Sequence, residues 1–342
     1  SQLNVLFGYL RTNIRLAGMT DKQILDLPKI TDEELIISMS IMHHVALAAY
    51  LTEPNLLPLI MFELIRLTLK HGLGPKTPVA FVVFGYINFA FMGKMEKGIK
   101  LGQLGNSIYE LLQDEHEFVS FKQVYIMFIS QWLEHLGKSI PHLEEALKKG
   151  LETGDFEFTS IIGQLLIYWN FYGAEPIDKI LKRGELLSKQ IAPLNQIMQI
   201  KRIDLFRQST LALVDGVNDF EVLHGELFDE RIINFPDEPA FSLYYHNLYA
   251  QKKMLALIFN QHEIAWKYCC LEKMHLIPIK GSVTEMLLFY YENICIGTIY
   301  SSKSAAEQKR LLKTSKKNMK LIESLVKYSP VNYQHRFEFM NA

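Results

Sequence analysis

The chain has 342 residues, of which 49% are hydrophobic and 21% charged, so it is long enough to bury one or more sizeable cores. Its formal net charge of −1 gives no general attraction to nucleic acid or to anionic membranes. Three cysteines are too few for a disulfide framework and are typical of a reducing compartment, so we expect a cytoplasmic protein. The chain begins Ser-Gln-Leu without a signal-peptide pattern, and we expect it to be a piece of a longer chain.

Helix starts are well marked along the chain, and no alternating apolar pattern bounded by hairpin turns is present. Asn55 is a candidate cap for a helix that tolerates Pro58 in its first turn. Four segments fit the capping box, in which two side chains satisfy two free backbone donors: Thr20…Gln23, Thr31…Glu34, Ser282…Glu285 and Ser304…Glu307. We therefore predict an all-α fold.

Long apolar stretches occur at 77–93 and 159–174. Both are shorter than the roughly 20 residues that span a bilayer, so we expect helices buried on most sides and no membrane span. Stripes at helical spacing occur elsewhere: Leu35, Met39, Met42, Ala46 and Ala49, then Leu143, Ala146, Leu147, Gly150 and Leu151, then Ile177, Ile180, Leu181, Leu187 and Ile191.

The clearest turn between two such helices is Gly154-Asp155. Gly154 can adopt the left-handed conformation that ends one helix, and Asp155 can cap the next. A break this short predicts an antiparallel helical hairpin. Glycines allow helices of a hairpin to approach closely, and Gly85, Gly98, Gly102 and Gly105 are placed to do so. Together these features predict a TPR-like solenoid of helical hairpins without the full repeat consensus.

One acidic segment interrupts the helical pattern, and it extends from 215 to 239. We predict an N-terminal helical-hairpin array at 1–214, this acidic interruption, and C-terminal hairpins with a capping helix at 240–342. One continuous solenoid is the alternative. The interruption is not expected to be a flexible linker, because its apolar residues need burial: Phe220, Leu223, Leu227, Phe228, Ile232 and Phe235.

Three segments resemble a known type of helical region: Pro54-Asn55-Leu56, 150–155, and the sequence from Pro330 to Phe337. The chain is similar to the TPR-like middle region of very large signalling proteins. In that family a serine/threonine-kinase-like domain and a STAND-type predicted ATPase precede the helical region, and GAF and histidine-kinase domains follow it. The resemblance implies a cytoplasmic regulatory scaffold whose enzymes lie outside this segment.

No motif indicates catalysis, a cofactor or a metal in this chain. Gly137-Lys138-Ser139 resembles the end of a phosphate-binding loop, but Trp132 occupies the position that requires glycine. The adjacent His43 and His44 point to different sides of a helix and cannot share a metal. Cys269 and Cys270 lack a visible base that would make them nucleophiles. An all-α enzyme is therefore the least favoured class.

Aromatic clusters and one lysine stripe are the candidate interaction sites. Core packing is the ordinary interpretation of the aromatics, and a concave partner or ligand groove is the alternative. The candidate groove residues are Trp132, Tyr168, Trp169, Tyr172, Tyr245, Tyr249 and Tyr290.

The lysine stripe lies on a helix predicted from Ala305 to Tyr328, which we expect to cap the solenoid. Leu312, Met319, Ile322 and Val326 should form its buried face, with Leu311 and Leu325 at the edge. The stripe is either plain solvated surface or an acidic docking site, for the segment from Asp215 to Glu238 or for a following domain. Its candidate residues are Lys309, Lys313, Lys316, Lys320 and Lys327.

The sequence thus predicts a non-catalytic scaffold that mediates protein–protein interaction and signal coupling inside a large kinase or ATPase protein. The alternative is a sensor that binds a small-molecule effector in an aromatic pocket. Nucleic acid is not an expected partner, since the lysine stripe has no interleaved aromatics for base stacking.

Overall fold

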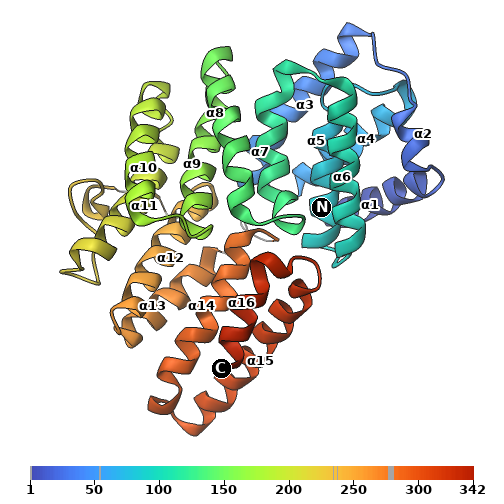
Figure 1. The fold of residues 1–342 in the computed structure, drawn as a ribbon. Coiled ribbons are helices and arrows are strands. Elements are labelled where there is room, and N and C mark those ends of the chain that lie inside the picture. Colours follow the sequence, from blue (N-terminus) through green and yellow to red (C-terminus); the bar gives the residue numbers. More distant parts are fainter. Residues whose placement is uncertain (1, 54, 234, 237, 276–280) are drawn as a thin grey trace. The chain divides into compact units, whose positions relative to one another are not determined.

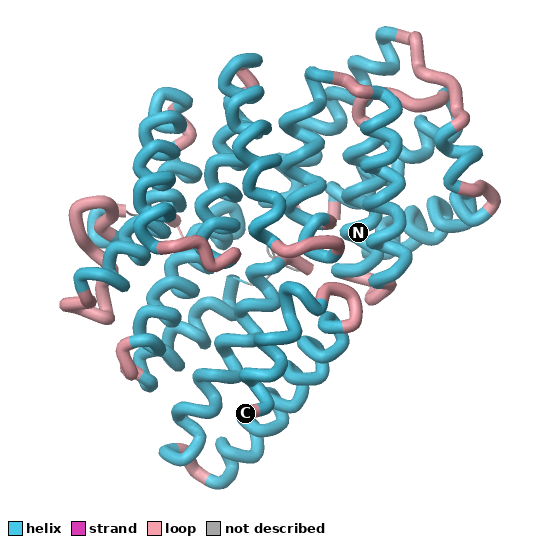
Figure 2. The backbone as a smooth tube through the Cα atoms, viewed as in Figure 1, coloured by secondary structure: helices cyan, strands magenta, loops and turns pink. Residues whose placement is uncertain are grey.

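The computed structural model describes residues 2–53, 55–233, 235–236, 238–275 and 281–342. These residues form helices joined by turns (Figures 1 and 2). Within these ranges β structure is limited to two isolated bridges, Lys29 with Leu73 and His224 with Asp229. The predicted all-α class is confirmed. Pro54 and Asp237, which belong to the segments singled out above, lie outside the described residues.

The chain divides into two compact units, Ser1–Ile129 and Ser130–Ala342. The acidic segment 215–239 lies inside the second unit, so the division expected around it does not coincide with the one in the structure. The first unit contains α1 (Gln2–Ala17), α2 (Asp21–Leu25), α3 (Glu33–Thr52), α4 (Leu56–His71), α5 (Thr77–Ala90), α6 (Met95–Leu112), the 3₁₀ turn η1 (Glu115–Glu117) and α7 (Phe118–Phe128).

Helix α5 is the centre of the first unit, where it packs against α4, α6 and α7. Every side chain from Thr77 to Phe89 is buried, as its long apolar run predicts. Polar groups inside this core are paired: the Tyr9 hydroxyl donates to Asn88 Oδ1 over 2.9 Å, and Lys76 forms a 2.5 Å ion pair with Glu117. The apolar stripe of α3 faces inward at Met39, Ala46 and Ala49.

Two glycines make the approach of α5 and α6 unusually close. A Cβ on Gly85 would lie 2.4 Å from the Gly98 carbonyl oxygen, and one on Gly98 would lie 2.5 Å from the Gly85 oxygen. Real Cβ atoms do not approach a carbonyl oxygen so closely, so any larger residue would push the helices apart. The prediction that these glycines allow close helix packing is confirmed.

The second unit begins with two 3₁₀ turns, η2 (Ser130–Trp132) and η3 (Leu136–Ser139). Its helices are α8 (Ile140–Thr153), α9 (Phe156–Tyr172), α10 (Ile177–Ile191), α11 (Ile197–Asp215), α12 (Ser242–Ile258), α13 (His262–Glu272), α14 (Val283–Ile299), α15 (Ala305–Val326) and α16 (Pro330–Asn341). Each packs against its successor, and α9, α12 and α14 also contact α11, α14 and α16 respectively. Figure 1 shows α14, α15 and α16 side by side.

The hairpin predicted at Gly154-Asp155 is confirmed. Gly154 ends α8 with a left-handed φ of 76°, and the Asp155 side chain accepts a hydrogen bond from the backbone N–H of Phe158. Across the hairpin, a Cβ on Gly150 would lie 2.0 Å from Thr159 Oγ1. Helix α9 is buried from Phe158 to Asn170 except for the half-buried Ile161.

The start of α16 is hydrogen-bonded to the beginning of the second unit. The Ser329 hydroxyl and the Asn332 side-chain amide donate to the Gln131 carbonyl, each over 2.8 Å. Asn332 also donates to the Glu134 carbonyl and accepts from the Leu136 N–H. We call this set of contacts the α16 clasp. It joins residues about 200 positions apart in the sequence. Because α16 follows α15, α15 is not the last helix of the unit, contrary to its predicted role as the terminal cap.

Two of the four predicted capping boxes are confirmed, at Thr20 and Ser304. At α3 the cap is Asp32 rather than Thr31, because the helix begins one residue later than predicted. Ser282 precedes α14 without capping it, and Glu285 instead accepts from the Gly281 N–H. Asn55 stands before α4 but makes no capping hydrogen bond.

Candidate functional site

Three of the predicted groove residues belong to the core of the second unit. Trp132, Tyr168 and Trp169 are each less than 5% exposed. Tyr168 stacks on Phe206 with ring centroids 4.3 Å apart and accepts a hydrogen bond from the Asn247 amide. Side chains so deeply buried offer no surface to a partner, so these three residues cannot line a groove in this structure.

The other four predicted groove residues are half-buried but lie in different surroundings. Tyr245 and Tyr249 stack with centroids 6.1 Å apart, and both lie against His275. Tyr290 instead lies 6.1 Å from Phe339 of α16. The fourth, Tyr172, faces a buried polar cluster. The structure therefore brings together one pair of these rings rather than a continuous aromatic groove.

The buried polar cluster is formed by α12 and α13. Lys253 of α12 pairs with Glu272 of α13, and both side chains are only 1% exposed. His246 Nδ1 lies 3.6 Å from the second carboxylate oxygen of Glu272 and is also 1% exposed. Tyr172 and Tyr291 line the same small cavity, whose volume is about 10 Å³. That is room for about one water molecule.

The charge state of this cluster follows from burial and pairing. Burial lowers the pKa of His246 to about 3, and the Lys253 ammonium nearby acts in the same direction, so the imidazole is neutral. Burial alone would lower the pKa of Lys253, but the Glu272 carboxylate reverses this and leaves the pKa above its ordinary value. A lysine held charged is not a nucleophile. The cluster is therefore best suited to fix α12 against α13.

No pattern in the sequence predicts a site at His246, Lys253 and Glu272. A lysine inside a helix normally indicates a solvent-facing side, and the partner carboxylate is 19 residues away. The sequence did carry a weak signal, because polar residues occur on several sides of α12, and in the structure these residues are buried. Those residues are His246, Asn247, Gln251, Lys252 and Lys253.

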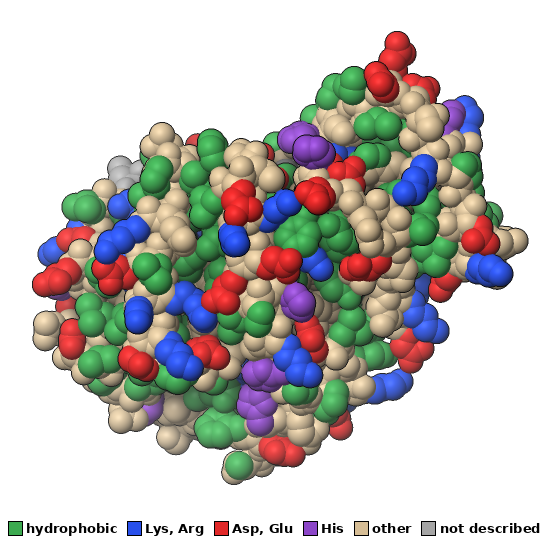
Figure 3. Space-filling view, turned by 45° about the horizontal axis from the view of Figure 1, so that its top comes forward, with side chains coloured by type: hydrophobic (Ala, Val, Ile, Leu, Met, Phe, Trp, Pro, Cys, Tyr) green, Lys and Arg blue, Asp and Glu red, His purple; other side chains and the backbone are tan. Residues whose placement is uncertain are grey.

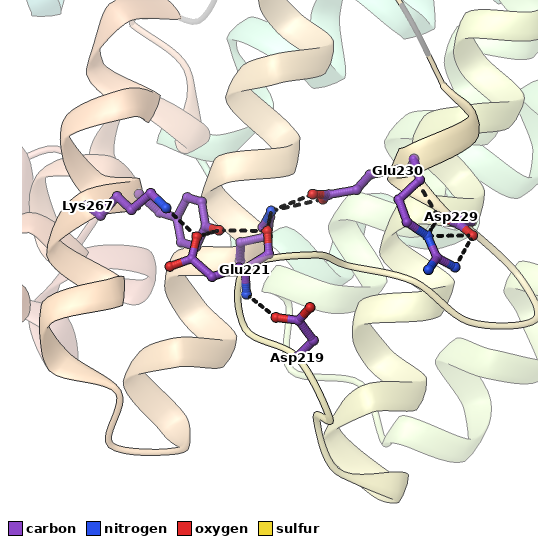
Figure 4. Close-up of polar contacts among 8 residues, drawn as sticks. Asp219, Glu221, Asp229, Glu230 and Lys267 are labelled. Carbon is purple, nitrogen blue, oxygen red and sulfur yellow. Dashed lines mark hydrogen bonds and ion pairs between the residues drawn. The ribbon is translucent and has the colours of Figure 1, made fainter.

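The acidic segment between α11 and α12 is held by lysines of α12 and α13 (Figure 4). Lys252 Nζ lies 2.7 Å from Glu230 Oε1 and donates to the Glu221 carbonyl over 2.7 Å. Lys267 forms an ion pair with the Glu221 side chain. The segment therefore has intramolecular partners, and the structure does not place it on the lysine stripe of α15.

Burial within the acidic segment follows the prediction in part. Leu223 and Phe228 are buried, and Phe220, Leu227 and Phe235 are half-buried. Ile232 is 77% exposed, contrary to expectation, and it lies in the 3₁₀ turn η5 (Glu230–Ile232), none of whose residues is buried.

The lysine stripe of α15 lies on the surface, with all five predicted lysines exposed. The helix is rotated relative to the predicted orientation: Leu311, Ile322 and Leu325 are buried, whereas Leu312 is 43% exposed. A groove of about 540 Å³ runs between α15 and α16. It is lined by Lys313, Lys316, Lys317, Met319, Lys320, Glu323, Phe337 and Asn341, and we call it the basic groove.

Charged side chains are otherwise well mixed. Figure 3 shows lysines and arginines interspersed with aspartates and glutamates over one face, with hydrophobic side chains between them. Several other lysines of the second unit form ion pairs with carboxylates: Lys252, Lys253, Lys267, Lys273 and Lys303. The basic groove differs from this pattern because it gathers four lysines beside one glutamate.

A further surface, which the sequence analysis did not single out, lies on α1 in the first unit. Its apolar side chains recur at helical spacing and are 49–77% exposed: Leu3, Leu6, Phe7, Leu10 and Ile14. We call this set the α1 stripe. The opposite side of α1 packs inward through Tyr9, Thr12 and Leu16. A Cβ on Gly8 would lie 2.7 Å from the Phe62 ring, so α1 is closely packed on α4. The spacing was visible in the sequence, but not which of the two apolar sides would be left uncovered.

The remaining candidate motifs lie on a 3₁₀ turn and on a helix. Gly137, Lys138 and Ser139 belong to the 3₁₀ turn η3. His43 is buried and His44 exposed, on different sides of α3. In the part of the chain that the structure describes, no cluster of three or more His, Cys, Asp or Glu side chains could hold a metal ion. Nor does any described helix combine the length and apolar character needed to cross a membrane.

Comparison with known proteins at the sequence level finds a similarity to a signalling protein. Over 147 residues the chain is 26% identical to the hybrid signal transduction histidine kinase G of Dictyostelium discoideum. The match covers 42% of this chain and 4% of that protein, so the chain corresponds to a small part of its relative's length. No protein-family description and no solved structure matches the chain. The similarity associates the chain with signalling proteins.

Proposed function

We propose that the chain is a non-catalytic, TPR-like helical scaffold that mediates protein–protein contacts within a larger cytoplasmic signalling protein. Two observations support the setting. Helices of the second unit pack on their successors and in several cases on the next helix but one, as stacked hairpins do. The similarity to part of a hybrid histidine kinase supports a role beside a kinase domain.

The observation that carries the proposal is the α1 stripe. Five large apolar side chains are exposed on one face of a helix whose other face is firmly packed. Burying a Leu, Ile or Phe side chain contributes about 1.5–3 kcal/mol, so covering this stripe would stabilise a complex considerably. Contiguous exposed apolar surface of this kind marks protein interaction sites.

A small-molecule sensor remains the second candidate. The cavity beside Tyr172 and Tyr291 has a volume of about 10 Å³, which is too small for an effector at that position. An effector would have to displace the buried Lys253–Glu272 pair or separate α12 from α13 to enter. The exposed α1 stripe requires no such rearrangement, and it therefore favours the scaffold.

Site-specific photo-crosslinking tests the proposal. A photoreactive phenylalanine analogue replaces Phe7, and in a matched variant it replaces the exposed Lys22 of α2. In cells that express the full-length protein, we expect discrete protein adducts or intramolecular cross-links at position 7 and none at position 22. Equal labelling at both positions, or none at position 7 in protein that remains folded, would refute the scaffold. Native mass spectrometry that instead finds a stoichiometric small molecule would favour the sensor.

A further inference from the structure

We propose that the basic groove between α15 and α16 binds an acidic helical segment of a partner domain, with one bulky apolar side chain of that segment seated between the two helices. This inference rests on the scaffold function proposed above and adds the chemistry of one partner. It concerns the second unit, whereas the α1 stripe lies in the first.

The basic groove carries a local excess of positive charge. Helix α15 carries six basic and two acidic residues. Among the described residues, no ion pair involves Lys313, Lys316, Lys317 or Lys320, although other lysines of the unit have carboxylate partners. Four ammonium groups along one groove repel one another, and an acidic partner would relieve that repulsion.

The shape of the basic groove also suits a helical segment with an apolar side chain. The lysines surround an apolar floor formed by Met319 and Phe337, both half-buried. Lys313 and Lys320 are seven residues apart, or about 10 Å along the helix axis. This spacing matches carboxylates at positions i, i+4 and i+7 of an approaching helix, and an apolar side chain between them would reach the floor.

Other possible occupants of the basic groove fit it less well. The chain's own acidic segment is already held by Lys252 and Lys267, so it is not available. A bilayer surface is flat and would leave the concave floor unfilled. A nucleic acid offers phosphates but needs aromatic faces for its bases, and among the described residues that line the groove Phe337 alone is aromatic. An acidic peptide with an apolar anchor uses both the lysines and the floor.

The test uses the whole chain and a fluorescent peptide. The probe is a peptide of about 16 residues, since shorter helices are marginal in water, with glutamates at i, i+4 and i+7 around one phenylalanine. Matched peptides replace either the glutamates by glutamine or the phenylalanine by alanine. We expect each replacement to weaken binding, measured by fluorescence anisotropy, by about tenfold or more. Raising the salt from about 50 to 300 mM should weaken the original peptide several-fold.

Variants of the chain provide the decisive comparison. Combining Lys313→Glu, Lys316→Glu and Lys320→Glu should weaken the peptide at least tenfold and leave the melting temperature nearly unchanged, since these side chains are exposed. Phe337→Ala should weaken the peptide while preserving its salt dependence. The control combines Lys22→Glu, Lys138→Glu and Lys182→Glu, which makes the same charge change at three exposed lysines on other elements.

Three results would overturn the proposal. One is equal loss of binding in both triple variants, which would indicate only a general charge effect. Another is binding that does not depend on the phenylalanine or on Phe337. The third is tighter binding of phosphatidylserine vesicles or single-stranded DNA than of the peptide. If any of these occurs while Phe7 still forms its cross-links, the scaffold function stands and the basic groove is not its acidic-partner site.

Discussion

Asn332 offers the sharpest test of how the second unit is held together. Its side chain, 2% exposed, bonds the carbonyls of Gln131 and Glu134 and the N–H of Leu136. In Asn332→Ala the Gln131 carbonyl keeps the Ser329 hydroxyl as a donor, but the other two groups lose their partner. An unsatisfied buried polar group costs about 1–3 kcal/mol. Two groups lose their partner, and one of them belongs to the half-buried Glu134, so we expect the free energy of unfolding to fall by about 2–4 kcal/mol.

Tryptophan fluorescence during urea unfolding measures this loss in the second unit alone. The three tryptophans of the chain, at 132, 169 and 266, all lie in that unit, and Trp132 is 5.7 Å from the Tyr333 ring of α16. The matched control is Asn341→Ala in the same helix, where an exposed amide donates to the Phe337 carbonyl. Its midpoint should shift little, because exposed local hydrogen bonds contribute little net stability. Equal shifts in the two variants would refute the reasoning.

Three further predictions concern stability. Gly85→Ala should destabilise the first unit by about 1–3 kcal/mol or more, measured by thermal unfolding followed by circular dichroism. Gly297→Ala, whose Cβ meets nothing within 4 Å, should instead stabilise α14 by about 0.5–1 kcal/mol, and the opposite signs would contradict the packing argument. His246 has a pKa of about 3 in the fold, below its value in the unfolded chain. The stability that the neutral His246 contributes to folding is therefore complete above about pH 6.5, and it falls by about 2 kcal/mol at pH 5. In His246→Gln, unfolding measured as a function of pH should lack this part of the pH dependence. Glu230→Ala should expose the segment 216–232 to limited proteolysis and Glu226→Ala should not, because Glu230 forms an ion pair with the buried Lys252 and Glu226 is exposed. Equal cleavage of both variants would show that the Lys252–Glu230 pair does not fix the segment.

Features decided within a few residues of sequence could be predicted. The turn at Gly154-Asp155 depends on one left-handed residue and one capping side chain, and both act locally. The burial of α5 likewise follows from an uninterrupted apolar run, which leaves no side that water could solvate. The exposure of the α15 lysines followed from their charge, since an unpaired ammonium group is costly to bury.

Features set by distant partners could not be predicted. On a helical wheel Leu311 and Leu312 both lie on or beside the apolar face of α15, and the packing of α15 against α14 and α16 decides that Leu311 is the buried one. Tyr168 and Trp169 are both core residues because helices cover α9 from several sides, so adjacent rings do not need an exposed face. Lys253 is buried only because Glu272 arrives from another helix. The candidate surfaces were thus predictable as charged or apolar, but not as grooves.

The α16 clasp also constrains the order in which the chain can fold. Its partners, Gln131 and Asn332, are separated by 201 residues, so the contact cannot form until the ribosome has made almost the whole second unit. At about 5–20 residues per second, that interval lasts roughly 10–40 s, long enough for the first unit to complete its own core. During this time α16 is absent, so Trp132 and the backbone groups of η2 and η3 remain uncovered. We therefore expect the chain to be most prone to misassembly, and most dependent on a chaperone, while its second unit is still being synthesised.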